Sequence, residues 1–372
     1  MITTFHIHGF RWYIDTTLPL GDHTCIIGGN GSGKTHILEA IHLASGWSLQ
    51  YIQAPRHESS EFELSFLDDI GIRSFVRIRR EEKDIYKIQW SPLSWVKYIE
   101  QLPYRTVFVS PFDMNLFYFA PSMRRDMIDS SIERAFGQFR KIRREYDAIM
   151  RQRNALLKRI REGDAQRNDL MYWDRAFAEK AYTYHLYRMK WVDFVGEHMG
   201  SISGALPKYR IHARYTSKIQ EKSEAYTLWI EESVLRYLGE NTERDILSGH
   251  THIWPHLDDF TFMIALGWGE SESIECSLFL SRWENKVLLL ALKQIEIFFL
   301  RKYLDLPIVL LFDDIFAELD MRHAENIIHS FEADQVIMTS QRPLPIWENW
   351  EYFSCINLNT EYHTENSYKP VA

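Results

Sequence analysis

The segment Gly28-Gly29-Asn30-Gly31-Ser32-Gly33-Lys34-Thr35 has the residue types and spacing of a phosphate-binding loop. It matches GxxxxGK[ST] at every fixed position, between a β-rich run, residues 23–28, and a helix-forming run, residues 35–43. Glycines let backbone N–H groups converge on phosphate oxygens, and the helix N-terminus adds partial positive charge. We therefore expect this loop to bind ATP, with Lys34 at the β- and γ-phosphates and Thr35 at Mg²⁺.

A second candidate group lies near the other end of the chain. The apolar run 308–312 reads as a strand buried on both faces, and Asp313 and Asp314 follow it directly. A phosphate-binding loop needs an acidic residue at the end of a neighbouring strand to hold magnesium, which predicts Asp313 as a metal ligand. Asp314 is then placed to orient or deprotonate the attacking water, so Asp314 and Lys34 are the predicted catalytic residues. The alternative without a functional role is a strand of the hydrophobic core that ends in two solvent-exposed aspartates.

The distance between these groups constrains the domain organisation. Lys34 and Asp313 lie about 280 residues apart, so one nucleotide site must bring both ends of the chain together. Such a split core is typical of ABC-type ATPases and their chromosome-maintenance relatives. We predict an α/β fold in which residues 1–120 and 245–372 form an ABC-like ATPase head with a mixed sheet, and residues 121–244 form a mainly helical second lobe.

The elements that must position these residues can be predicted from hydrophobic periodicity. Strands are expected over 1–13, 23–28, 105–109 and 307–312, with a meander of strands over 61–90. Helices are expected within 123–162 and over 171–199 and 281–303. Since each lobe helix is short, the pair predicts a compact antiparallel lobe, without a long coiled-coil arm.

Composition bounds the class of protein. Hydrophobic residues are 45% and charged residues 25%, as in ordinary globular proteins. Cys25, Cys276 and Cys355 are isolated and predict neither a metal site nor a disulfide framework. Apolar runs stay well short of the roughly 18–20 residues that a membrane span needs, and the N-terminus lacks a signal-peptide pattern. We expect a cytoplasmic location.

A basic run is the candidate nucleic-acid surface. Residues 140–162 hold nine Lys or Arg against three acids, in a chain of net charge -8. Local basic density of this kind favours contacts to DNA phosphates without sequence specificity, although a solvated helix face is the ordinary alternative. The candidates for binding duplex DNA are Arg140, Lys141, Arg143, Arg144, Arg151, Arg153, Lys158 and Arg159.

Several separate segments resemble motifs of the RecF family, in the family's order and at comparable spacing. The helix after the loop, 35–41, is similar to "KTNLLEAI", and 121–129 is similar to "PxxRRxFLD". Residues 151–158 resemble "QRNxLLK", 255–259 resemble "GPHRDD", and 313–320 resemble "DDVxSELD". The resemblance implies dimers that close over ATP, ATP-dependent binding to duplex DNA with weak hydrolysis, and cooperation with RecR and RecO at gaps, in repair and replication restart.

The signature segment departs from the family pattern. Where RecF proteins read roughly "SxGQ", this chain has Ser281-Arg282-Trp283-Glu284. The resemblance makes Ser281 a candidate contact to ATP, whereas a helix N-cap is the alternative. A bulky Trp283 and an anionic Glu284 are unfavourable near phosphate. These departures leave two alternative functions open. The chain could be an ABC-like scaffold that binds ATP without hydrolysing it, or a phage-defence regulator.

Overall fold

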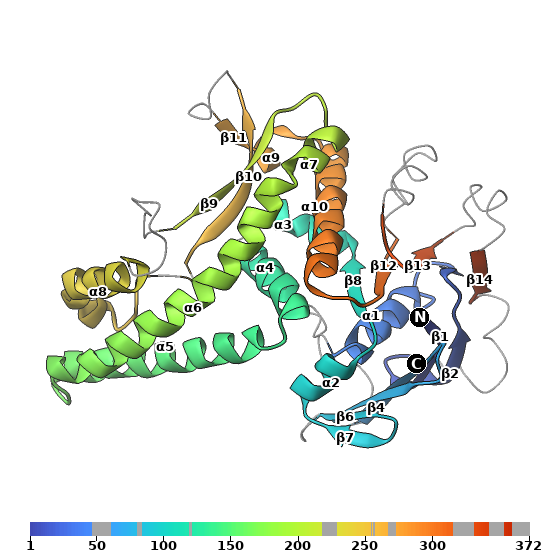
Figure 1. Ribbon diagram of the computed structural model, residues 1–372, viewed down its shortest axis with the longest axis horizontal. Helices are drawn as coiled ribbons and strands as arrows, with labels where there is room; N and C mark the ends of the chain where they lie inside the picture. The colour runs from blue at the N-terminus through green and yellow to red at the C-terminus, as the bar shows by residue number, and fades with distance from the viewer. Residues whose placement is uncertain are drawn as a thin grey trace. The chain divides into compact units, whose positions relative to one another are not determined.

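A computed structural model describes residues 1–46, 61–79, 84–118, 121–217, 229–253, 255, 257–266, 273–314, 331–341 and 353–358. The chain forms two compact units (Figure 1). The first unit contains Met1–Met114 and Leu292–Ala372, and the second contains Asn115–Ala291. Both ends of the chain therefore belong to one unit, as predicted from the distance between the two halves of the nucleotide site.

The first unit is built around a parallel sheet. Its strands lie in the order β14-β3-β13-β12-β8, and each strand runs parallel to its neighbours. The interior strand β12 is buried along its whole length, which explains its apolar composition. The strands are β3 (His23–Ile27), β8 (Arg105–Val109), β12 (Ile308–Phe312), β13 (Gln335–Ser340) and β14 (Phe353–Asn357).

An antiparallel sheet completes this unit, in the order β2-β1-β4-β5-β6-β7. Helix α1 (Lys34–Ala44) contributes Ile37 to the same hydrophobic core as Leu64 of this sheet and Val309 of the parallel sheet. The strands are β1 (Ile2–Phe10), β2 (Tyr13–Pro19), β4 (Glu61–Asp68), β5 (Arg73–Arg79), β6 (Ile85–Ile88) and β7 (Ser91–Leu93), with helices α2 (Trp95–Gln101) and η1 (Pro111–Met114). This α/β head confirms the predicted fold class.

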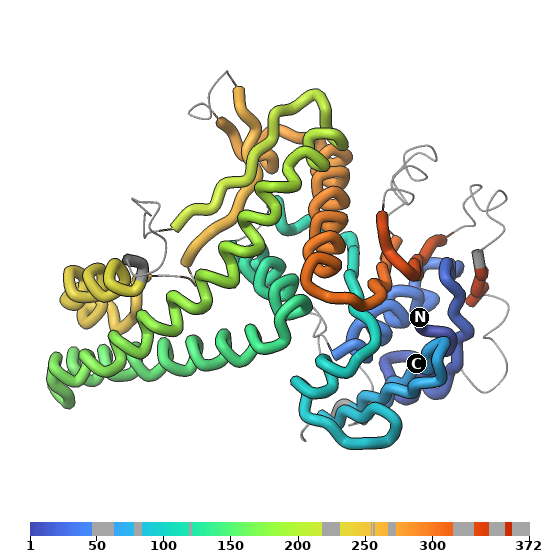
Figure 2. Tube along the Cα trace, in the orientation of Figure 1, coloured from blue at the N-terminus to red at the C-terminus, as the bar shows by residue number. Residues whose placement is uncertain are grey.

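The second unit contains the helical lobe. Helices α5 (Phe139–Glu162) and α6 (Leu170–Glu197) form an antiparallel pair (Figure 2). Gly163 ends α5 with a φ of 87°, the left-handed conformation that glycine adopts at helix C-termini. The other elements are α3 (Asn115–Tyr118), α4 (Pro121–Ala135), η2 (Arg167–Asp169), α7 (Met199–Ala205), β9 (Ile211–Thr216), α8 (Trp229–Ser248), β10 (Asp259–Ala265), β11 (Ser273–Glu275) and α9 (Cys276–Phe279).

The boundaries of the units differ from the predicted ones. We expected the head to resume at residue 245, but the boundary lies within α10 (Arg282–Tyr303), between Ala291 and Leu292. The reason is a small sheet of order β11-β10-β9. Strand β10 pairs with β9 from Asp259↔Thr216 to Ile264↔Ile211, which holds the segment after residue 245 in the second unit. No helix in the described ranges is long and apolar enough to cross a membrane.

Candidate functional site

The glycine-rich loop joins β3 to α1 and curls around the Lys34 side chain. Gly31 and Gly33 have φ angles of 78° and 93°, in the region that favours glycine. Lys34 Nζ donates hydrogen bonds of 2.8 Å to the carbonyl oxygens of both Gly28 and Gly29. Burial lowers the pKa of Lys34, and the nearby carboxylates of Asp314 and Asp313 oppose that effect. The lysine is therefore held at the loop by backbone oxygens.

One side of the loop is open. A Cβ atom added to Gly29 or Gly31 would meet no heavy atom of the described residues within 4 Å. On the other side the packing is close, because a Cβ on Gly33 would lie 2.7 Å from the Tyr13 hydroxyl. A backbone concavity ahead of a helix N-terminus, with one open side, is a shape that accommodates phosphate oxygens.

Asp313 and Thr35 meet although they are 278 residues apart in sequence. Strand β13 lies between β3 and β12, so all three strands present their carboxyl ends at one edge. Thr35 Oγ1 lies 2.9 Å from each carboxylate oxygen of Asp313. Burial raises the pKa of Asp313, while the hydrogen bonds from Thr35 and Thr339 act to lower it. The structure thus places the predicted metal-binding hydroxyl and carboxylate together.

Thr339, at the end of β13, organises both carboxylates. Its Oγ1 donates to Asp313 Oδ1 at 2.9 Å and accepts from the backbone N–H of Asp314 at 2.9 Å. Asp314 has a φ of 44°, and its Oδ2 accepts a 3.1 Å bond from Gln341 Nε2. The sequence predicted neither contact, since nothing local to Asp314 points to them. Residues 315–320 of the motif lie outside the described residues.

Ser281 has a different environment, in the second unit. Its Oγ and backbone N–H donate to Glu284 Oε2 at 2.7 and 2.9 Å, and Glu284 N–H donates back to Ser281 Oγ at 3.3 Å. This reciprocal arrangement is a capping box at the start of α10. Tyr209 donates to the other oxygen of Glu284 at 2.7 Å, and this bond is the main cause that lowers the pKa of Glu284. The geometry of this chain favours the helix-cap interpretation of Ser281.

The prediction that Arg153 is one of the DNA-binding residues is wrong. This side chain is 0% exposed and donates to Asp174 at 2.7 Å and to Asp245 at 2.8 Å, so it cannot reach DNA. Arg143 lies at the border of the buried face and pairs with Asp126 at 3.1 Å and with Glu133 at 3.5 Å. Exposed members remain on the opposite side of α5, and these residues, called the α5 stripe below, are Lys141, Arg144, Arg151, Lys158 and Arg159.

The other motifs converge on the segment before β10. Arg124 makes a two-bond pair with the Asp259 carboxylate at 2.8 and 2.6 Å. Asp129 accepts 2.9 Å bonds from two nitrogens of Arg188, which also donates to the carbonyl of Pro255. These charged groups are paired inside the second unit, so their physical role is to fasten the segment before β10 to α4 and α6. The sequence missed Arg188, because it lies within an otherwise ordinary helical stretch.

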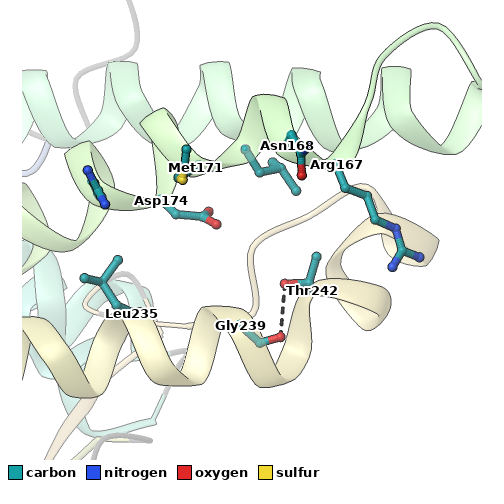
Figure 3. Close-up of a pocket in the computed structure, with 9 residues that line it drawn as sticks. Arg167, Asn168, Met171, Asp174, Leu235, Gly239 and Thr242 are labelled. Atoms are coloured by element: carbon teal, nitrogen blue, oxygen red, sulfur yellow. Dashed lines mark hydrogen bonds between the residues drawn. The ribbon is translucent and has the colours of Figure 1, made fainter.

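A cavity of about 240 Å³ lies elsewhere in the second unit, between α6 and α8 (Figure 3). Its wall includes Met171, Leu235 and Thr242. Asp174 also lines it, but this carboxylate is already engaged by buried Arg153. The cavity therefore has a mixed lining, in which Arg167, Asn168 and Arg175 lie beside Leu170 and Met171. The groups suited to nucleotide chemistry lie instead at the loop of the first unit.

Known proteins similar to this chain include a family model and several relatives. Residues 4–180 match the family model described as an AAA domain. The RecF protein of Chloroherpeton thalassium is 27% identical over 337 residues, which cover 87% of this chain and 89% of that protein. RecF of Shewanella loihica is 26% identical, and the match covers 94% of each chain. Both relatives carry the name DNA replication and repair protein RecF.

Solved structures show the same fold. The recombination mediator protein RecF in the RecFOR pathway, described as RecF-ATPrS, superposes with a TM-score of 0.83 at 22% identity, over 96% of this chain and 95% of that chain. The structure described as RecF-ATP gives a TM-score of 0.82, over 92% of each chain. Similarity to RecF proteins thus extends over nearly the whole chain, and it confirms the RecF resemblance that the motifs predict.

Proposed function

We propose that this chain is an ATP-dependent, duplex-DNA-binding protein of recombinational repair and replication restart. The observation that carries the proposal is the junction of Lys34, Thr35 and Asp313 at one edge of the parallel sheet, in a chain that is similar to RecF proteins along its length. A cytoplasmic location accompanies this function. The scaffold and phage-defence alternatives have no comparable support, because the relatives carry a repair and replication name.

The described residues fit ATP and Mg²⁺. The loop from Gly28 to Thr35 supplies backbone N–H groups, a lysine and a hydroxyl, and its open side has room for phosphate. Thr35 Oγ1 and the Asp313 carboxylate are hard oxygen donors at the same point, which suits magnesium. Magnesium, when bound, neutralises charge on the phosphates. We assign its binding to Thr35 and Asp313.

Weak ATP hydrolysis forms a further part of the proposal. Asp314 is the candidate that orients or deprotonates water, and Gln341 together with Thr339 holds it in position. Lys34 supplies positive charge at the phosphates. The family resemblance adds a homodimer in which Ser281 of a second copy approaches ATP. In this chain the Ser281 hydroxyl already donates to Glu284, so the proposed dimer would close over ATP without a hydrogen bond from that hydroxyl.

Duplex DNA is the proposed partner of the second unit. The α5 stripe offers exposed cations at spacings of three or seven residues along one face of the helix, with Arg159 directly after Lys158. We extend RecR and RecO to this chain as partners, because the solved RecF structure is described in the RecFOR pathway.

The proposal is tested by measuring binding to labelled duplex DNA at fixed low salt with ATP, with ADP and without nucleotide. Sedimentation of the same samples reports dimer formation. We expect DNA binding and dimers with ATP alone, because only a triphosphate completes the proposed contacts. ATP binding without either response would contradict the proposed function and favour a scaffold.

The α5 stripe gives a second prediction. The double variant Arg151→Ala/Lys158→Ala is expected to reduce the slope of log affinity against log salt by roughly 1.8, since each lost phosphate contact removes about 0.9. Arg175→Ala/Arg236→Ala is the matched control, because it removes the same charge from exposed positions of α6 and α8. Titrations at several salt concentrations measure both slopes. Equal slopes for the two double variants would exclude the stripe as the DNA surface.

A further inference from the structure

Strand pairing brings together two cysteines that are isolated in the sequence. Cys355 of β14 lies directly opposite Cys25 of β3 in the parallel register of these strands. Their neighbours Ile26 and Ile356 both belong to the hydrophobic core that contains residues of α1. Because side chains alternate between the two faces of a strand, both cysteines point to the other face of the sheet. Two thiols therefore lie side by side, on neighbouring strands and on one face.

The distance between the two strands suits a disulfide. Neighbouring strands of a sheet lie about 4.7–4.9 Å apart, and disulfides join Cα atoms that are usually about 4.4–6.8 Å apart. Both cysteines are thiols in the structure. A bond between their sulfurs can therefore form while the two strands keep their register.

The two thiols differ in their access to solvent. Cys355 is exposed, whereas Cys25 is 0% exposed. Burial raises the pKa of the Cys25 thiol well above its usual range, and the nearby Cys355 adds to this effect. An oxidant in solution therefore meets Cys355 first, and Cys25 reacts only with a sulfur that is already beside it.

We propose that Cys25 and Cys355 form a reversible disulfide that fastens β14 to β3 when the surroundings become oxidising. The oxidant is a small disulfide such as oxidised glutathione. The Cys355 thiolate attacks one of its sulfurs and releases the first glutathione thiolate. The sulfur of Cys25, which gives up its proton to solvent, then attacks the sulfur of Cys355 and displaces the second glutathione thiolate. Two protein thiols become one disulfide, and the oxidant is reduced to two thiols.

The bond holds an edge strand that contacts the glycine-rich loop. Among the described strands, β14 pairs with β3 alone. Leu358, directly after β14, donates its backbone N–H to the carbonyl of Ile27 at 2.9 Å, and a Cβ on Gly28 would lie 3.4 Å from Leu358 Cβ. The cysteines are also about 330 residues apart in the sequence, so the bond restricts the unfolded chain. Oxidation therefore retains β14 on the sheet and stabilises the first unit.

The test is intact-mass spectrometry of the full chain after incubation with oxidised glutathione, followed by alkylation of the remaining thiols under denaturing conditions. The unaltered chain is expected to carry no glutathione, to keep one thiol for alkylation and to give a peptide that joins Cys25 to Cys355. Dithiothreitol should reverse the change. Cys25→Ser should stop with one glutathione on Cys355, because the second thiol is missing. Cys355→Ser should remain unmodified, because its other thiols are buried.

Cys276→Ser is the matched control, because Cys276 is also buried but belongs to the second unit. It should form the same bond as the unaltered chain. The oxidised chain should melt about 4–16 °C above the reduced chain, and Cys25→Ser should show no such shift.

Glutathione that stayed on Cys355 of the unaltered chain would overturn the inference, since the neighbouring thiol would have failed to displace it. An unmodified Cys355 would overturn it as well. Equal melting of the oxidised and reduced chains would show that the bond does not fasten β14, which contradicts the proposed role.

Discussion

Replacing Arg153 by alanine is expected to lower the free energy of unfolding by about 3–5 kcal/mol, because it leaves buried carboxylates without their cation. Asp245 is 1% exposed and accepts a 2.8 Å bond from Arg153, while Asp174 accepts a 2.7 Å bond from the same guanidinium. Thr251 also loses its bond from Arg153. The change should reduce the melting temperature by about 6–20 °C for a unit of this size.

The control for this variant lies two positions away on the same helix. Arg151 is exposed, so Arg151→Ala should change the unfolding free energy by less than about 0.5 kcal/mol. Urea denaturation and thermal melting of both variants measure the difference. Arg153→Ala with the stability of Arg151→Ala would show that Arg153 does not serve as a buried cation. For DNA binding we expect the opposite order, in which Arg151→Ala has the larger effect. The reason is that only Arg151 belongs to the α5 stripe.

Arg153 also shows what the sequence could have predicted. It lies four residues after Ile149 and four before Leu157, in phase with the apolar face of the helix. A count of charges along residues 140–162 does not show which face of the helix each residue occupies. A helical projection would have placed Arg153 on the apolar face and Arg151 on another face. Its partners Asp174 and Asp245 come from α6 and α8, and no local pattern identifies them. The burial was therefore predictable, but the ion pairs were not.

The candidate site also has one part that could be predicted from the sequence and one part that could not. The glycine-rich loop could be predicted because its chemistry is written in consecutive residues, 28–35, between a strand and a helix. The contacts of Thr339 with Asp313 and Asp314 depend on strand order, since β13 must lie between β3 and β12. The capping box at Ser281 could have been predicted from the S-x-x-E spacing alone.

The remaining differences between the predicted and the observed fold result from strand pairing. Residues 1–13 contain no proline or other clear turn signal, so they were predicted as one strand, but the chain turns at Arg11 and Trp12. That turn became visible only through the pairing of Phe10 with Tyr13. The pairing of β9 with β10 likewise moved residues 259–265 into the second unit. Contacts between distant segments are set by the whole fold, and one sequence carries little local signal for them.

Lys34→Met is expected to weaken ATP binding by roughly 100- to 1,000-fold, or about 3–4 kcal/mol, because the phosphates lose their buried charged partner. DNA binding should then no longer respond to ATP. The fold should survive, since burial already disfavours the charged lysine and lowers its pKa. The losses in stability are the bonds from Nζ to the Gly28 and Gly29 carbonyls, and methionine fills a similar volume.

Lys97→Met is the matched control for this variant, because Lys97 is an exposed lysine on α2 of the same unit. Calorimetry with MgATP, thermal melting and the DNA titration should be run on both variants. Lys97→Met should behave like the unaltered chain in all three measurements. If Lys34→Met melted normally and kept its ATP affinity, nucleotide binding would have to occur away from the loop. If it lost ATP binding but kept ATP-stimulated DNA binding, the proposed coupling between nucleotide and DNA would be wrong, because the cation at the loop is the link through which ATP is sensed.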